Sequence, residues 1–411
     1  MKQNLELLSS PSEIRALAAN LKQKKIIAFD TEFIRETTFY PVVEIIQVAT
    51  DEESWLIDAQ AFFVKDGGEK REGLRPLLDI FEDRSILKVL HAAQGDQECL
   101  FTAFGVVATP SFDTAVAASL CGYGDGIGLG NLLKAVLGVT IKKGHARTNW
   151  SVRPLPAQLS EYAHADVIHL VEAAEKLISE LDQLKRKEWA LELSSKWEDK
   201  KLYMPDPDGL AHKLGKGGRL DQKGYAALVE LVRWREERVR QLNLPRRWVA
   251  DDNILMDLAQ VRPKDIAHLS AFRGLNKGEL KNSGEAILTA LQRASEAAPV
   301  SAPKNPRTEM ATGDESQAVE LLKCYVGILA DRQQVAIKHL MNAAQLLPLL
   351  RSQVETVEDF VTQGVLSESS ARLIGPEVLA MLQGKRALSL DSGGNSGDGK
   401  TGTNVKIVEL S

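Results

Sequence analysis

Short apolar runs with the spacing of strands occupy the first part of the chain. They cover residues 26–30, 44–49, 54–57 and 86–90. A helix-like stretch at 74–81 separates the last two runs, and from Ala115 onward the apolar positions recur mostly with the period of a helix. Strands followed by helices in this order predict a mixed α/β sheet with helices packed against it.

Beyond Leu181 the strand-like runs fade, and two segments rich in Pro, Gly or polar residues interrupt a helical pattern. The helical regions place apolar residues on one face, as helices that pack into a core do. The last residues are rich in Gly, Ser and Asp and predict disorder. The predicted organisation is an α/β domain at 1–200, a linker at 201–219, a helical domain at 220–297, a linker at 298–314, a second helical domain at 315–388 and a disordered tail at 389–411.

The composition is that of folded globular domains. The chain has 411 residues, 44% of them apolar and 26% charged, which is too long for one ordinary core. No run reaches the roughly 18 uncharged residues that span a bilayer, and the N-terminus lacks the apolar core of a signal peptide. We therefore expect a cytoplasmic protein without membrane contact. The three cysteines, Cys99, Cys121 and Cys324, are widely spaced and predict reduced thiols.

The net charge of −5 is unevenly distributed along the chain. Residues 183–298 contain 22 Lys and Arg against 17 Asp and Glu, which leaves 29 against 39 for the remainder. A local positive excess is typical of a surface that binds nucleic acid, and acidity elsewhere suits a metal-binding centre.

The tail contains a pattern that matches a nucleotide-binding loop. Residues 394–401 fit G-x-x-x-x-G-K-T letter for letter. Such a loop functions only between a buried strand and a helix whose N-terminal amides hold the phosphates. Because only about ten residues follow in this low-complexity segment, we expect no nucleotide hydrolysis from it.

Four acidic residues and a tyrosine form the strongest chemical pattern in the sequence. Asp30 and Glu32 end the first predicted strand, where the period of two places both carboxylates on one face. Asp96 follows a later strand where a helix begins, and Tyr162 and Asp166 lie four residues apart on one helical face. Oxygen-rich sites without His or Cys favour Mg²⁺ or Mn²⁺ over zinc.

In this order the three segments resemble the DEDD exonuclease superfamily, whose motifs are Asp-x-Glu, a mid-domain Asp and, in one branch, Tyr-x-x-x-Asp. The segment 148–155, TNWSVRPL, resembles ribonuclease D more than a polymerase proofreading domain. His164 departs from the family, which more often has a small residue there. Residues 228–288 look like a helicase-and-RNase-D C-terminal (HRDC) domain, carried by Trp234-Arg235-Glu236, Asn243-Leu244-Pro245, Trp248-Val249, Leu258-Ala259 and Arg273-Gly274.

The resemblance implies a ribonuclease H-like exonuclease domain followed by two all-α HRDC-like domains, the second more divergent. It also implies hydrolysis of RNA from the 3′ end by two divalent cations, Mg²⁺ or Mn²⁺, about 4 Å apart. Asp30, Glu32 and Asp166 would hold one ion, and Asp30 with Asp96 the other. Tyr162 would position the attacking water, because a phenol with a pKa of about 10 is a poor base at neutral pH. The implied role is release of 5′-mononucleotides in 3′ maturation of tRNA precursors, by a monomer.

Basic and aromatic residues near the motifs are candidates for RNA contacts. Lys142, Lys143, Arg147 and Arg153 could line the path of the RNA backbone. Trp150 could stack on a base or lie in the core, and both interpretations stay open.

Four further side chains lie near the motifs. Phe33 fits a core residue somewhat better than a base contact, and His91 is kept as a substrate candidate. Metal binding by His91, His145 or His164 is not expected, because the carboxylates suffice.

Two alternatives compete with an exoribonuclease. A nucleic-acid-binding protein with an inactive nuclease fold would lack a motif carboxylate, and none is missing. A DNA-directed exonuclease remains possible on fold alone, although the HRDC-like region favours ribonuclease D.

Overall fold

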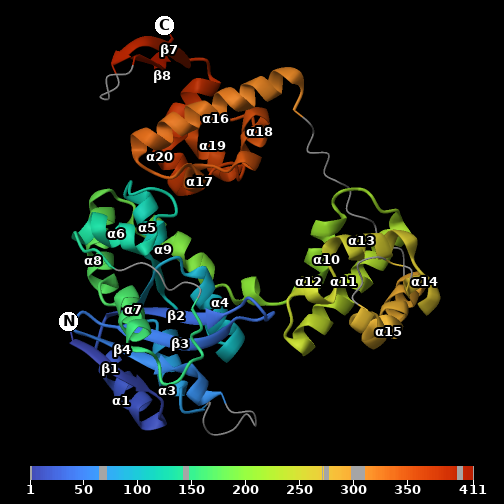
Figure 1. The fold of residues 1–411 in the computed structure, drawn as a ribbon. Coiled ribbons are helices and arrows are strands. Elements are labelled where there is room, and N and C mark those ends of the chain that lie inside the picture. Colours follow the sequence, from blue (N-terminus) through green and yellow to red (C-terminus); the bar gives the residue numbers. More distant parts are fainter. Residues whose placement is uncertain are drawn as a thin grey trace.

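The chain folds into one α/β unit and two helical units, which follow one another in the sequence (Figure 1). The computed structural model describes residues 2–63, 72–141, 148–270, 272, 277–297, 311–395 and 401–410. Within this part of the chain, no helix is both long and apolar enough to cross a membrane.

A six-stranded mixed sheet forms the centre of the first unit. Its strands lie in the order β1-β4-β3-β2-β5-β6, and β2 pairs antiparallel with β3 and parallel with β5. Strands β2 to β5 correspond to the four predicted runs, whereas β1 and β6 were not predicted. The strands are β1 (Lys2–Leu8), β2 (Ile26–Ile34), β3 (Val42–Ala49), β4 (Glu53–Asp58), β5 (Leu87–Leu90) and β6 (Ser111–Asp113).

Helices cover both faces of this sheet. Successive residues of β2 point to opposite faces, so Ile27 and Phe29 pack with α1 (Pro11–Leu21) and α3 (Arg75–Glu82). Ala28 faces the other side, where α7 and α8 pack, and Asp30 and Glu32 continue the Ala28 series. The remaining helices of the unit are α4 (Gln94–Phe104), α5 (Thr114–Leu120), α6 (Leu129–Leu137), α7 (Ala157–Val167), α8 (Leu170–Gln183) and α9 (Lys187–Ser195).

A β-bulge interrupts the pairing of β2 with β3 next to the motif carboxylates. Glu32 pairs with Ile45, but Phe33 pairs with Val43, so Glu44 is an extra residue on β3. The bulge reverses the alternation of β3. Val43 therefore packs into the core with α1 and α3, while Ile45 packs beneath α7.

The two helical units repeat one order of helix lengths. Each contains a helix of 21 residues that is capped by a residue with left-handed backbone, Asn243 or Gln334, and is followed by a four-residue helix. The helices are α11 (Gln222–Leu242), α12 (Arg246–Val249), α13 (Asp252–Val261), α14 (Ile266–Ser270) and α15 (Lys277–Glu296), then α16 (Gly313–Gln333), α17 (Ile337–Leu340), α18 (Ala343–Arg351), α19 (Val357–Thr362) and α20 (Glu368–Leu382).

Two expectations about connecting segments are wrong. The linker predicted at 201–219 contains a helix, α10 (Pro207–Gly215), whose Ala211 is buried in the core formed by α11, α13 and α15. The tail predicted to be disordered contains an antiparallel hairpin, β7 (Arg386–Asn395) with β8 (Thr401–Glu409). Cross-strand pairing gives this segment a structure that its composition does not indicate.

Both helical units contact the α/β unit. The side-chain oxygen of Asn243 accepts hydrogen bonds from the backbone N–H groups of Phe39, at 3.1 Å, and Tyr40, at 2.9 Å, in the loop after β2. In the C-terminal unit, His339 Nε2 lies 2.8 Å from Ser119 Oγ. Buried apolar residues of α5, α8 and α9 form one continuous core with those of α16 to α20.

Candidate active site

Three of the predicted carboxylates converge where β2 ends beneath α7. Asp30 and Glu32 come from β2, and Asp166 comes from the last turn of α7, which packs on the same face of the sheet. One carboxylate oxygen from each of these residues lies within 4.8 Å of the others. These three residues together with Asp96 are called the carboxylate cluster below.

Asp96 lies beside the other three, in the first turn of α4, and is only 6% exposed. Its Oδ1 accepts hydrogen bonds from the Thr31 backbone N–H, at 2.9 Å, and from Thr31 Oγ1, at 2.5 Å. Burial raises its pKa to about 6, although the Thr31 donors and a hydrogen bond with Asp30 act in the opposite direction. Thr31, the residue inside the Asp-x-Glu motif, was not predicted to take part.

The carboxylate cluster has a high proton affinity because it is buried and crowded. Burial raises the pKa of Asp30 well above its usual range, and the nearby Asp96, Asp166 and Glu32 raise it further. Burial, with repulsion from Asp166 and Asp96, raises the pKa of Glu32 to about 8. The pKa of Asp166 rises to about 7, again mainly through burial. An arrangement that concentrates negative charge in this way is relieved by cations.

Tyr162 lies one helical turn before Asp166 and donates a hydrogen bond to it. Its ring lies 6.1 Å from the Trp150 ring, centroid to centroid. Burial, followed by repulsion from Asp166, Glu32 and Asp30, raises the pKa of its hydroxyl. The hydroxyl therefore stays protonated, and able to donate a hydrogen bond, across the physiological pH range.

Two residues predicted to contact RNA have structural roles. Trp150 is 2% exposed and packs with Ile45, Leu56 and Leu159 beneath α7, so no ring face is available to a base. Of the two interpretations of Trp150, the structure favours the core role. Arg153 was assigned to the RNA backbone, but its guanidinium is bonded within the protein.

All the N–H groups of Arg153 have acceptors. Nε and Nη2 donate to the two carboxylate oxygens of Asp58, at 2.8 and 2.6 Å. Nη1 donates to the carbonyls of Trp150 and Val152, and Nη2 also donates to the carbonyl of Glu44. A side chain with its donors committed in this way has none left for a phosphate, so the structure favours a role of Arg153 within the protein over the predicted RNA contact.

Two other candidates, Phe33 and His91, are partly buried. Phe33 is partly buried, with its ring beside Gly95. His91 Nδ1 lies 2.9 Å from Thr114 Oγ1, and burial lowers its pKa. Lys142, Lys143 and Arg147, like His145, lie outside the described residues.

His164 faces away from the carboxylate cluster. It is fully buried, and its Nδ1 lies 2.8 Å from Ser54 Oγ on β4. The side chain that departs from the family pattern is thus a packing residue between α7 and the sheet. Glu44, the bulge residue, is a buried acid that the sequence pattern did not indicate.

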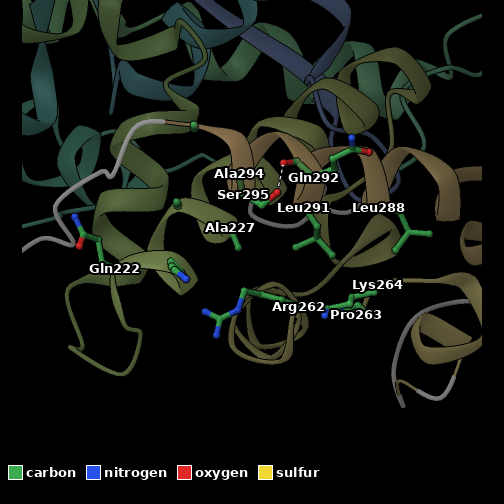
Figure 2. A pocket seen from close by; sticks show the side chains of 13 residues that line it. Gln222, Ala227, Arg262, Pro263, Lys264, Leu288, Leu291, Gln292, Ala294 and Ser295 are labelled. Carbon is green, nitrogen blue, oxygen red and sulfur yellow. Dashed lines mark hydrogen bonds between the residues drawn. The ribbon is translucent and has the colours of Figure 1, made fainter.

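A separate cavity of about 660 Å³ lies in the first helical unit (Figure 2). Its floor is apolar, with Ala227, Leu288 and Leu291, and the long side chains of Arg262 and Lys264 lie at its edge. It contains none of the predicted site residues and therefore does not compete with the carboxylate cluster as the catalytic site.

Comparisons with known proteins place two parts of the chain in known families. A family model described as 3'-5' exonuclease matches residues 5–182, and one described as HRDC domain matches residues 226–291. A ribonuclease D of Nitrobacter hamburgensis is 32% identical over 390 residues, 95% of this chain and 98% of that protein. One of Bartonella henselae is 32% identical over 83% of this chain and 82% of that protein.

Solved structures share the fold over most of the chain. The crystal structure of Escherichia coli RNase D, described as an exoribonuclease involved in structured RNA processing, has a TM-score of 0.77 at 24% identity and covers 93% of this chain and 99% of that one. A protein from Bifidobacterium adolescentis has a TM-score of 0.64 at 18% identity with the same coverage. At these identities the likeness establishes the architecture.

Proposed function

Since the chain is a 3′-to-5′ exoribonuclease of the ribonuclease D family, we propose that it trims structured RNAs such as tRNA precursors. In this proposal the metal ligands are Asp30, Glu32, Asp96 and Asp166. The observation that carries this proposal is the convergence of three carboxylates within 4.8 Å beside a fourth that is buried. Phosphodiester hydrolysis requires a site of this kind, because it must neutralise charge on phosphate and on both reacting oxygens.

The donor set of the carboxylate cluster fits Mg²⁺ or Mn²⁺. All its ligand atoms are carboxylate oxygens, and burial, with repulsion from neighbouring acids, raises the pKa values of Glu32 and Asp166, a cost that bound cations would offset. Asp30, Glu32 and Asp166 would hold one ion, and Asp30 with Asp96 a second. The chemistry that two such ions supply when bound is activation of water and stabilisation of the leaving oxygen.

The protein's own residues set the geometry for that chemistry. Two hydrogen bonds from Thr31 fix the orientation of the Asp96 carboxylate. The hydroxyl of Tyr162, held next to Asp166, would orient the attacking water. Because its pKa is raised, it would keep its proton and act by positioning.

The helical units would hold the RNA upstream of the cleaved nucleotide. Lys223, Arg247 and Lys264 in the first helical unit are exposed and form no ion pair with the described residues. Cations of this kind bind phosphates without reading sequence. We also assign residues 313–382 to a second HRDC copy, which the repeated order of helix lengths supports.

The proposal is tested with purified protein on 3′-extended tRNA and on single-stranded DNA, with and without Mg²⁺. We expect release of 5′-mononucleotides from the RNA only with the metal. Asp30→Ala should lower the single-turnover rate by at least about a hundredfold in a folded protein. Asp51→Ala is the matched control, because Asp51 is an exposed acid in the turn between β3 and β4.

Persistent cleavage by a folded Asp30→Ala protein would contradict the assigned site. Faster cleavage of DNA than of RNA would contradict the substrate. A combined Lys223→Ala, Arg247→Ala, Lys264→Ala variant should bind tRNA precursors more weakly and with a smaller dependence on salt, while its cleavage of short oligonucleotides is unchanged. Unchanged affinity would remove the first helical unit from RNA capture.

A further inference from the structure

We propose that Arg153 is a positioning residue, which together with Asp58 fixes the loop before α7 on the sheet and so holds Tyr162 and Asp166 against Asp30 and Glu32. The inference rests on the proposed active site. It gives Arg153 a role within the protein, whereas its place in the sequence beside the Tyr-x-x-x-Asp motif suggested a contact with RNA.

The contacts of Arg153 join three parts of the fold that are distant in sequence. Asp58 ends β4, Glu44 is the bulge residue of β3, and the carbonyls of Trp150 and Val152 belong to the loop that precedes α7. The guanidinium is planar and offers its donors in fixed directions, so it specifies the relative placement of all three parts.

The position of this loop determines the position of α7. Only Pro154, Leu155 and Pro156 separate Arg153 from the start of the helix, and each proline restricts the backbone. Trp150, held by its carbonyl to Arg153, packs beneath the helix beside Tyr162. A shift of the loop would therefore move Tyr162 and Asp166 relative to the two carboxylates of β2.

The charges around Arg153 also oppose a role in binding RNA. Asp58 forms a two-point ion pair with it, and the Glu44 carboxylate, of which 5% is exposed, lies 4.0 Å from Nη2. Glu44 Oε2 accepts no hydrogen bond from the described residues, and its ion pair is with Arg153. One cation among two acids presents no net positive charge to a phosphate.

Two variants of the full chain distinguish positioning from substrate binding. Arg153→Lys keeps the positive charge but cannot reproduce the two parallel hydrogen bonds to Asp58. Asp58→Asn removes the negative charge of the partner, and an aspartate would not itself bind the anionic RNA. If Arg153 positions α7, both variants should lower the single-turnover rate at saturating RNA by about tenfold to a hundredfold, since a misplacement of about 1 Å costs on that order. RNA affinity measured in EDTA should change less than about twofold.

Mn²⁺ binding without RNA gives a readout independent of catalysis. Mn²⁺ is titrated into each protein, and electron paramagnetic resonance monitors the free ion. The two variants should need severalfold more Mn²⁺ than the wild type for half-saturation, because Asp166 is no longer held in place. The double variant should resemble either single one, as residues that act as a unit do. Arg75→Lys is the matched control, because Arg75 also bridges two acids, Asp79 and Glu82, but on α3 at the opposite face. It should leave rate and Mn²⁺ binding unchanged.

Three outcomes would overturn the inference. The first is weaker RNA binding by Arg153→Lys with tighter binding by Asp58→Asn, which is the signature of a phosphate contact. The second is a lower melting temperature with unchanged rate and Mn²⁺ binding at 20 °C, which would make the ion pair merely stabilising. The third is a folded Asp58→Asn protein whose single-turnover rate and Mn²⁺ binding equal those of the wild type. Of the two variants, this one is expected to disturb folding less. Inactivity of the wild type on every RNA would instead refute the proposed function.

Discussion

Replacing Glu32 by Gln should make the metal-free protein more stable while it abolishes activity. Burial and the neighbouring acids raise the pKa of Glu32 from 4.5 to about 8. A carboxyl whose pKa is higher in the folded state favours folding when protonated, below about pH 4.5. That contribution is lost as the pH rises through about 8, because the unfolded chain then holds fewer protons than the folded one.

The size of this effect follows from the same values. A rise from 4.5 to about 8 corresponds to at most about 5 kcal/mol of destabilisation at pH 9, at about 1.4 kcal/mol for each pH unit. Because the neighbouring acids share protons and solvent reaches part of the side chain, about 2 kcal/mol is expected. For a unit of this size, 2 kcal/mol raises the melting temperature by about 4–8 °C.

The assay is thermal denaturation in EDTA at pH 5 and pH 9. Glu32→Gln should melt higher than the wild type at pH 9, and the difference should shrink at pH 5. Glu36→Gln, an exposed acid two residues beyond β2, should change neither value. Mg²⁺ should stabilise the wild type most at pH 9, since it binds the ionised carboxylates. A wild type whose stability in EDTA increases between pH 5 and pH 9, or a Glu32→Gln protein no more stable at pH 9, would refute the reasoning.

Three further changes probe other parts of the molecule. Tyr162→Phe deletes only the hydroxyl next to Asp166 and should lower the single-turnover rate without changing RNA affinity, so an unchanged rate would leave the ring as packing alone. Thr31→Val removes one of two donors to Asp96 and should raise the Mg²⁺ concentration needed for half-maximal rate by about tenfold, on the scale of a hydrogen bond to a charged group; an unchanged Mg²⁺ dependence would show that the backbone bond suffices. A chain ending at Lys200 should melt earlier and expose apolar surface to a dye, because α5, α8 and α9 lose the cover of α16 to α20; an equal melting temperature would show that the shared core adds no stability.

The sequence predicted the strands that carry strong apolar runs and missed those that do not. β1 opens with three polar residues, KQN, and β6 has three residues in all, so neither contains a long apolar run. α10 was taken for a linker because Pro205, Pro207 and Gly209 were interpreted as breakers. Proline at the first turn starts a helix, and Asp206 caps it through a hydrogen bond to the Gly209 N–H.

The acidic motifs predicted a metal site because spacing alone puts Asp30 with Glu32, and Tyr162 with Asp166, on shared faces. The role of Arg153 could not be predicted in this way. Its main partner, Asp58, lies 95 residues earlier in the chain, and only the folded structure brings the end of β4 beside the loop before α7. A basic residue near an acidic site was therefore assigned to the substrate.

The bulge at Glu44 limits which changes of length this region can accept. Deleting that one residue would leave Val43 directly before Ile45 and still opposite Phe33, so both side chains would keep their faces. It would remove the carbonyl that accepts a hydrogen bond from Arg153 Nη2, and it would remove the bend that the extra residue introduces just after the loop at Phe39 and Tyr40. Substitutions in this loop are tolerable over a wide range of side chains, because its bonds to Asn243 come from the backbone. Insertions and deletions between β2 and β3 are not tolerable in the same way, because they would displace these backbone groups from Asn243. Relatives that keep this contact should therefore keep the number of residues in the loop even where the residues themselves differ.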